Sequence, residues 1–323
     1  MLMPPLLSLA VEEALECHGL EALGQAAAEL STAYRSGPGG GRSPVSTEVH
    51  RLAYLATRLP ATYAAVHAVL SEVSSRLPQA EITSLLDLGA GPGTAAWAAT
   101  AVLPRLERVT LVERDEAWIQ TGRSLARSGG SPLLVAAEWI CADLRSEPSL
   151  DPHDLVVASY ALGELESQQL DQVLGAAWAA ASTALVVVEP GTTAGFGVVR
   201  RVRSRLVEIG GHLVAPCPHE RDCPLPAGDW CHFAQRVERS SVHRRLKAAA
   251  LGHEDEKHTY VAASRAPAAT CAARVLRHPL RRSGHTRLEL CAQDGLRTLT
   301  VARSDGVRWQ QARRTAWGDE WPD

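Results

Sequence analysis

A glycine-rich segment that follows an aspartate is the first part of the chain whose residue types suggest chemistry. The segment LLDLGAGPGT, residues 85–94, joins an apolar run to a helical pattern. Glycines at such a turn let the main chain approach a ligand closely and accept positive φ angles. Pro92 interrupts the G-x-G-x-x-G spacing of dinucleotide sites, and the Gly-Lys-Ser/Thr ending of a phosphate loop is absent. An ordinary tight turn between a strand and a helix is the alternative interpretation.

Two acidic residues follow at positions suited to binding a nucleoside. Glu113 ends the second predicted strand, 24 residues after Gly89, where a carboxylate can accept hydrogen bonds from both ribose hydroxyls. Asp143 follows the third predicted strand and could accept a hydrogen bond from an adenine amino group, unless it only caps a helix. The order and spacing of these features resemble the S-adenosylmethionine-binding methyltransferase fold. The predicted cofactor-binding residues are Asp87, Gly89, Ala90, Gly91, Gly93, Glu113, Asp143 and Ser159.

No catalytic residue can be assigned from the sequence. The segment SYALGE, residues 159–164, follows the fourth predicted strand and lacks the Asn/Asp-Pro-Pro-aromatic pattern of amino-group methyltransferases. Ser159, Tyr160 and Glu164 could position a substrate or simply pack. Because the sulfonium donor is already activated, such a protein mainly has to align the acceptor. Methyl transfer therefore stays open.

A second constellation consists of cysteines. Cys217, Cys223 and Cys231 are spaced C-x5-C-x7-C, within CPHERDCPLPAGDWCHF. Thiolates bind iron–sulfur clusters and zinc, although structural zinc sites favour closer cysteine pairs. An iron–sulfur cluster, a zinc ion and no metal all remain possible from spacing alone. For a fourth ligand we prefer Cys291, at a strand end before a turn, over Cys271 in a run of small residues.

The surrounding patterns predict an α/β protein with three regions. Residues 1–80 carry apolar residues at helical spacing, with a flexible break at residues 36–44. Residues 81–210 alternate short apolar runs with helical segments, which predicts a doubly wound, Rossmann-like methyltransferase sheet. Residues 211–323 predict a cysteine-rich extension with β-like runs and a final basic helix.

The charge of the chain is unevenly distributed. The net charge is −3, yet residues 234–323 contain 17 Arg and Lys against 10 Asp and Glu. A basic C-terminal third suits a polyanion such as RNA, or it only keeps the surface soluble. Candidate phosphate contacts are Arg200, Arg201, Arg203, Arg205, Arg281, Arg282, Arg313 and Arg314. We expect neither a membrane nor DNA as a partner. The N-terminus has no secretory pattern, and the odd count of seven cysteines argues against a disulfide framework, so we expect a cytoplasmic protein.

Together these segments resemble a known family: the bacterial relatives of the mitochondrial small-ribosomal-subunit assembly factor with a methyltransferase-like fold. The matching segments include LLDLGAGPGTAAWAA, VVASYALGEL, LVVVEPGT, CPHERDCPL, WCHFAQ, LCAQDG and ARRTAWGD. The resemblance implies binding of S-adenosylmethionine at the glycine loop and Glu113. It also implies a [4Fe–4S] cluster held by Cys217, Cys223, Cys231 and Cys291, and small-subunit ribosomal RNA as the partner.

Three functions are therefore compatible with the sequence. The first is an S-adenosylmethionine-dependent methyltransferase-like protein that acts on small-subunit ribosomal RNA or in small-subunit assembly. The second is a non-catalytic assembly factor that binds ribosomal RNA and uses cofactor and cluster structurally. The third is a small-molecule methyltransferase with a zinc-bound insertion and no affinity for RNA.

Overall fold

The computed structural model describes residues 2–16, 18–36, 45–146 and 148–322. The break predicted at residues 36–44 lies outside this part, apart from Ser36. The N-terminal helices are α1 (Pro5–Leu15), α2 (Leu20–Ser36), α3 (Glu48–Thr57) and α4 (Leu59–Arg76). Thr47 caps α3, because its side chain accepts a hydrogen bond from the main-chain N–H of His50. The predicted N-terminal helical region is therefore present. No described helix is long and apolar enough to cross a membrane.

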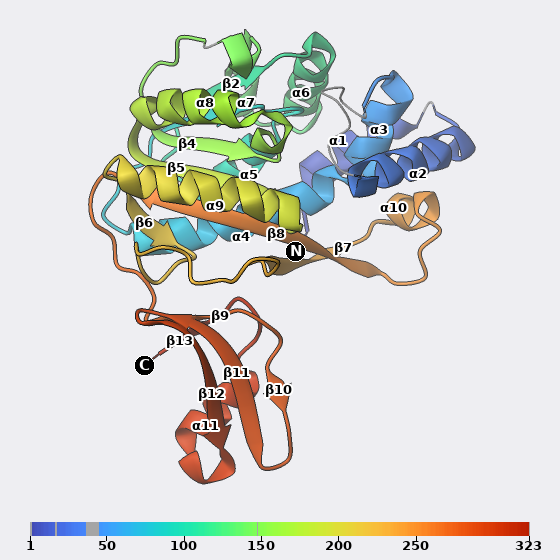
Figure 1. The fold of residues 1–323 in the computed structure, drawn as a ribbon. Coiled ribbons are helices and arrows are strands. Elements are labelled where there is room, and N and C mark those ends of the chain that lie inside the picture. Colours follow the sequence, from blue (N-terminus) through green and yellow to red (C-terminus); the bar gives the residue numbers. More distant parts are fainter. Residues whose placement is uncertain (1, 17, 37–44, 147, 323) are drawn as a thin grey trace.

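The centre of the molecule is a mixed sheet whose parallel part is doubly wound (Figure 1). Its strands lie in the order β3-β2-β1-β4-β5-β8-β6, and β7 also pairs with β8. The strands are β1 (Ser84–Leu88), β2 (Arg108–Glu113), β3 (Glu138–Cys141), β4 (His153–Ser159), β5 (Ala181–Pro190), β6 (His212–Ala215), β7 (Phe233–Glu238) and β8 (His253–Ser264). Strands β1 to β5 are parallel, and β8 joins β5 antiparallel. The predicted Rossmann-like sheet is confirmed.

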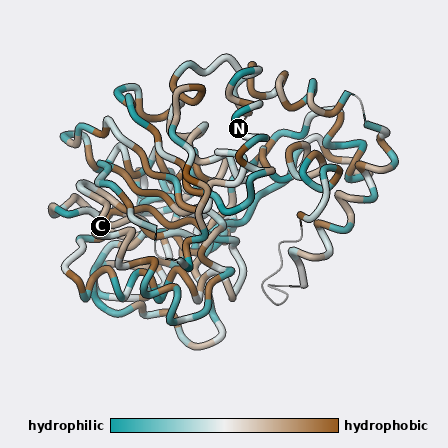
Figure 2. Tube along the Cα trace, turned by 90° about the horizontal axis from the view of Figure 1, so that it is seen from above, coloured by the Kyte–Doolittle hydropathy of each residue, from teal (hydrophilic) through white to brown (hydrophobic). Residues whose placement is uncertain are grey.

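Helices cover both faces of this sheet. They are α4 together with α5 (Thr94–Val102), α6 (Glu116–Ser128), α7 (Pro132–Val135), α8 (Ser167–Ala180) and α9 (Thr193–Glu208), whereas α10 (Ser241–Leu246) packs against α2 and α3. Alternate residues of each strand point to opposite faces, and the buried residues divide accordingly. Leu85 and Val157 pack in one core with α3, α4 and α5 residues, whereas Leu86 and Val156 pack in a second core with residues of α8 and α9. Figure 2 shows hydrophobic residues concentrated along the central strands.

Residues 211–323 divide between two sheets. Strands β6, β7 and β8 belong to the central sheet, so that sheet extends beyond the predicted boundary at residue 210. The reason is that β8 is buried along its second half and pairs with the long apolar strand β5 over seven residues. The remainder forms a small second sheet that projects below the main body in Figure 1. It contains β9 (Ala273–Val275), β10 (Leu280–Arg281), β11 (His285–Ala292), β12 (Gly295–Ala302) and β13 (Glu320–Trp321), packed against α11 (Val307–Arg314).

Candidate functional site

The glycine loop leaves the carboxyl end of β1 and turns into α5. Gly89, Gly91 and Gly93 have φ angles of 68°, 54° and 81°, which favour glycine strongly. The main-chain N–H groups of Gly89 and Ala90 donate to the carbonyl of Val112 at 2.9 and 3.0 Å, which ties the loop to the neighbouring strand β2. A Cβ atom on Gly89 would lie 2.5 Å from the Cβ of Ala161. The loop is therefore shaped for close approach and leaves no room for a side chain at its first glycine.

Glu113 at the end of β2 fixes the shape of this loop. Its Oε2 accepts a hydrogen bond from the Gly91 N–H at 2.8 Å, and its Oε1 accepts one from the Asp115 N–H at 3.0 Å. The side chain is only 8% exposed and lines the cavity next to the loop. The predicted cofactor carboxylate therefore holds two main-chain segments together while it faces the cavity.

This cavity has a volume of about 170 Å³ and lies at the carboxyl ends of β1, β2 and β4. Ligands of open α/β sheets bind at this edge. Six of the eight predicted cofactor-binding residues line it: Gly89, Ala90, Gly91, Glu113, Asp143 and Ser159. Asp87 and Gly93 are not among the lining residues.

Asp87 lies beneath the loop and is completely buried. Neither of its carboxyl oxygens makes a well-formed hydrogen bond within the described residues. Burial raises the pKa of Asp87 to about 7; the N–H of Ala96 acts in the opposite direction, and the nearby Glu113 raises it further. Asp87 is thus a buried carboxyl group that is substantially protonated near neutral pH.

Asp143 is paired with an arginine on its own loop. The Arg145 Nε lies 2.9 Å from Oδ1 and 3.0 Å from Oδ2 of Asp143. This hydrogen bonding lowers the pKa of Asp143 to about 2, so the group stays a carboxylate. An adenine amino group would therefore meet a carboxylate whose oxygens are already shared with a guanidinium.

Tyr160 lines the other side of the cavity, and Glu256 and Arg58, which are not among the lining residues, hold its side chain. Tyr160 follows β4 directly, has the unusual φ of 56° for a non-glycine residue, and donates its hydroxyl to Glu256 at 3.1 Å. Arg58 holds the same carboxylate through two hydrogen bonds of 3.0 and 3.2 Å. Tyr34 and Tyr54 complete this wall from the N-terminal helices. Only long-range pairing of β8 brings Glu256 here, so the sequence carried no local signal for it.

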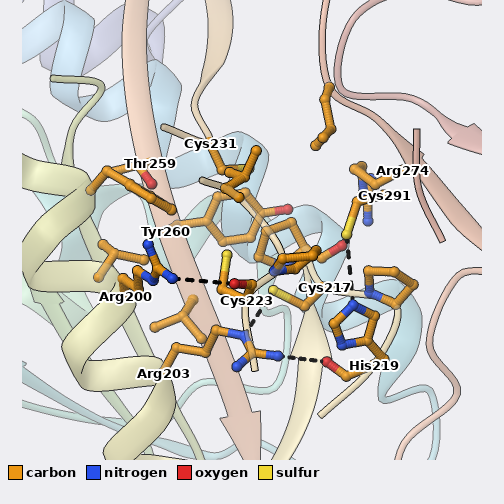
Figure 3. Close-up of a pocket in the computed structure, with 18 residues that line it drawn as sticks. Arg200, Arg203, Cys217, His219, Cys223, Cys231, Thr259, Tyr260, Arg274 and Cys291 are labelled. Carbon is orange, nitrogen blue, oxygen red and sulfur yellow. Dashed lines mark hydrogen bonds between the residues drawn. The ribbon is translucent and has the colours of Figure 1, made fainter. Parts of the chain in front are cut away.

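The four predicted cysteine ligands line a second, smaller cavity of about 40 Å³ (Figure 3). Cys217, Cys223 and Cys231 come from the loop between β6 and β7, and Cys291 comes from β11 of the second sheet. The alternative ligand Cys271 is buried but is not among the lining residues.

The thiols of this cavity affect one another. Burial raises the pKa of Cys231 well above its usual value, and the neighbouring thiols Cys217, Cys223 and Cys291 raise it further. Burial likewise raises the pKa of Cys291 to about 12. Such thiols ionise only with a strong positive partner. The part of the chain described by the structure contains no group of three or more ligating side chains arranged for a metal ion.

The arginines of α9 that the sequence suggests as phosphate contacts have different surroundings. Arg203 is 4% exposed and turns inward to the cysteine loop. Arg201 pairs with Asp171 at 2.6 Å, and Arg205 pairs with Glu208 at 3.1 Å. The prediction of a phosphate contact is wrong for Arg203, because the amphipathic α9 places that position on its buried side. By contrast, Arg281, Arg282, Arg313 and Arg314 lie exposed on the second sheet and α11.

The sheet order and the site at its carboxyl edge define a methyltransferase-like α/β protein. The chain belongs to the family described as mitochondrial small ribosomal subunit Rsm22, whose model matches residues 48–322. The family resemblance inferred from the sequence is therefore confirmed, whereas a bacterial source stays a prediction.

The curated relatives agree with this family. The chain is 29% identical over 295 residues to the human protein "Ribosome assembly protein METTL17, mitochondrial", covering 85% of this chain and 63% of that protein. It is 26% identical over 328 residues to "Rsm22-cox11 tandem protein 2, mitochondrial" of Schizosaccharomyces pombe, covering 85% of this chain and 43% of that protein. The chain thus spans less than two thirds of either relative. The mitochondrial names contradict the predicted cytoplasmic location and point to mitochondria instead.

Similar solved structures are methyltransferases, at low identity. Magnesium protoporphyrin IX methyltransferase from Synechocystis PCC 6803 has a TM-score of 0.43 and 13% identity, with 73% of this chain and 94% of that chain covered. The N-methyltransferase NodS from Bradyrhizobium japonicum WM9 has a TM-score of 0.40 and 15% identity, with 61% of this chain and 84% of that chain covered. These similarities concern the fold alone.

Proposed function

We propose that this protein binds S-adenosylmethionine and acts in assembly of the small ribosomal subunit. The observation that carries the cofactor proposal is the joint geometry of Glu113 and the glycine loop. Glu113 keeps Gly91 in place and still faces the cavity, so its free lone pairs can accept hydrogen bonds from ribose hydroxyls. The positive φ angles keep the loop backbone free of side chains that would fill the space. When bound, the sulfonium of this cofactor supplies an activated methyl group.

We further propose that Cys217, Cys223, Cys231 and Cys291 hold a [4Fe–4S] cluster, with zinc as the alternative. The donor set fits, since three thiols from the loop between β6 and β7 and one from β11 line one cavity and act electrostatically on one another. A cluster there would join the second sheet to the central one. The wide C-x5-C-x7-C spacing favours a cluster over a zinc knuckle.

Ribosomal RNA is the proposed partner, and the second sheet is the proposed contact. The family description and the METTL17 name refer to the small ribosomal subunit and to ribosome assembly, and they motivate this partner. Arg282, Arg313 and Arg314 are exposed on the projecting sheet and form no ion pair with a described carboxylate. Phosphate groups would supply their missing counter-charge, which would make binding salt-dependent.

A second candidate is assembly without methyl transfer, and Tyr160 favours it. The residue occupies the position directly after β4, and Glu256 and Arg58 hold it there. An acceptor base would have to displace this side chain. In this reading the cofactor stabilises the fold and the surface that binds RNA.

The central experiment measures ligand content and transfer on one preparation. Iron, acid-labile sulfide and zinc are determined per chain on anaerobically purified protein, with Cys291→Ser as the ligand variant and Cys271→Ser as its matched control. About four irons and four sulfides, lost only in Cys291→Ser, support the cluster. One zinc without sulfide rejects it.

Methyl transfer is tested with labelled S-adenosylmethionine and immature small subunits. Gly91→Arg is the variant, because an arginine at a φ of 54° strains the loop and fills the cavity. Transfer that is lost in this variant supports the enzyme. Cofactor binding without transfer to any subunit intermediate supports the non-catalytic factor, and absence of cofactor binding by the unaltered protein rejects both.

A further inference from the structure

Arg203 and Arg274 are the two buried arginines that line the cysteine cavity, each 4% exposed, and Arg203 is the one that contacts the cysteine loop directly through a cysteine sulfur. It projects from α9 toward the loop that carries Cys217 and Cys223 (Figure 3). Its Nε donates to the Sγ of Cys217 at 3.3 Å, and its Nη2 donates to the carbonyl oxygens of His219, at 2.8 Å, and Arg221. A single guanidinium thus binds one predicted ligand and two main-chain groups of the ligand loop.

This guanidinium has no carboxylate partner. Arg203 forms no ion pair with any Asp or Glu of the described chain, and it is 96% removed from solvent. Arginine stays protonated in proteins, so the charge cannot be relieved by losing a proton. A buried charge is unfavourable unless an opposite charge and hydrogen bonds compensate it. Among the residues that the structure describes, the carbonyls of His219 and Arg221 supply part of this compensation, and the sulfur of Cys217 is the only other acceptor.

The other arginines at the cavity have different surroundings. The guanidinium of Arg274 forms an ion pair with Glu72, so its charge is already balanced. Arg200 donates to the carbonyl of Cys223 at 3.2 Å and is half-buried, so water screens its charge. Arg203 is therefore the buried cation of this cavity whose counter-charge the described protein does not provide.

We infer that Arg203 is the built-in counter-ion of the metal centre and that its charge is fully balanced only when the four cysteines bind as thiolates. This inference rests on the proposed metal site. Four thiolates around a [4Fe–4S]²⁺ core carry a net charge of −2, and four thiolates around Zn²⁺ carry the same charge. Loading would therefore turn an unfavourable buried cation into half of a buried ion pair. Arg203 would couple metal content to the stability of the ligand loop.

The test compares one substitution in two states of the protein. Arg203→Met keeps the approximate length of the side chain and removes its charge. Stability against urea is measured in the loaded protein and in protein stripped of metal by a chelator under reducing conditions. We expect Arg203→Met to destabilise the loaded protein and to leave the stripped protein unchanged or more stable. Release of iron, or of zinc, to the chelator should become at least tenfold faster.

Two further variants separate charge from packing. Arg203→Lys keeps the charge but loses the planar fork, so release should lie between the unaltered protein and Arg203→Met. Arg201→Met removes an exposed charge on the same helix that pairs with Asp171 and does not line the cavity, so it should change both states equally. If the metal is a cluster, Arg203→Met should also lower its reduction potential, because a nearby positive charge favours the reduced form.

The outcomes distinguish this inference from the proposed function. If the unaltered protein binds neither iron nor zinc, the proposed metal site is wrong and the inference falls with it. If the unaltered protein loads metal but Arg203→Met shifts stability equally in both states, the site stands and the counter-ion role is rejected. If Arg203→Met does not fold, metal release from Arg203→Lys that is as slow as release from the unaltered protein would overturn the inference in the same way.

Discussion

The buried carboxyl group of Asp87 makes a specific prediction about pH. Burial raises its pKa to about 7 in the folded protein, from 3.8 for an ordinary aspartate. A group whose pKa is raised by folding contributes stability that is fully present below the unfolded pKa. That contribution is lost as the pH rises through the folded pKa, because the unfolded chain releases the proton earlier. For Asp87 the window therefore extends from about pH 4 to about pH 7.

The expected magnitude follows from this shift. A difference of about three pKa units corresponds to about 4 kcal/mol, at roughly 1.4 kcal/mol for each unit. Asp87→Asn removes the titration and keeps the size of the side chain. The free energy of unfolding of Asp87→Asn, relative to the unaltered protein, should therefore rise by up to about 4 kcal/mol between pH 4 and pH 8. Most of the rise should occur below pH 7.

The assay is equilibrium unfolding in urea at half-unit steps of pH, without added cofactor. Subtracting the two proteins cancels the titration of the buried histidines, whose contributions are common to both. Asp154→Asn serves as the opposite control. Although burial acts to raise the pKa of Asp154, hydrogen bonds from Thr83 and Ser84 outweigh it and lower the pKa. The free energy of unfolding of Asp154→Asn should therefore be lower than that of the unaltered protein at neutral pH, and this difference should shrink below pH 4. A difference between Asp87→Asn and the unaltered protein that stays constant from pH 4 to pH 8 would refute the reasoning.

Three further predictions concern single contacts. Glu113→Gln leaves one main-chain N–H facing an amide NH₂, which costs about 1.5–3 kcal/mol of binding free energy. S-adenosylhomocysteine should therefore bind at least tenfold more weakly by calorimetry. Unchanged affinity would contradict the role of Glu113 in shaping the loop. Arg58→Met leaves the carboxylate of Glu256 without its cation and should reduce the free energy of unfolding by about 3 kcal/mol in urea. A loss of unfolding free energy no larger than that caused by replacing an exposed arginine would contradict the pairing of Arg58 with Glu256 as a source of stability. Thr47→Ala removes the cap of α3 and should cost about 1 kcal/mol by thermal unfolding, whereas Thr47→Ser should cost less.

Much of the fold could be predicted because it depends on patterns within short segments. The apolar runs that form β1, β2, β4 and β5 alternate with helical periodicity, and this order favours a parallel sheet with helices on both faces. The β11–β12 pair and the basic helix α11 also lie where the sequence predicts them. The antiparallel insertion of β8 between β5 and β6 could not be predicted, because pairing between distant strands depends on which apolar edges remain uncovered.

The candidate sites were predicted in part for the same reason. The glycine loop and the residues at strand ends converge on one edge of the sheet because parallel strands share their carboxyl ends. The C-x5-C-x7-C spacing identified three cysteines on a single loop, whereas the place of Cys291 beside them required the second sheet to pack there. Glu256 reaches the hydroxyl of Tyr160, which lines the cofactor cavity, only through the pairing of β8.

The sequence by itself determined the strand–loop–helix unit of the glycine loop, the alternation that builds the sheet and the family to which the chain belongs. Tertiary structure alone decided which charged groups are buried and what they face. Asp87 is completely buried beneath the loop, and Arg203 turns to the cysteines rather than outward to a phosphate. The physical reason is that local periodicity reflects neighbours a few residues apart, whereas burial and charge balance depend on elements far apart in the chain that pack together.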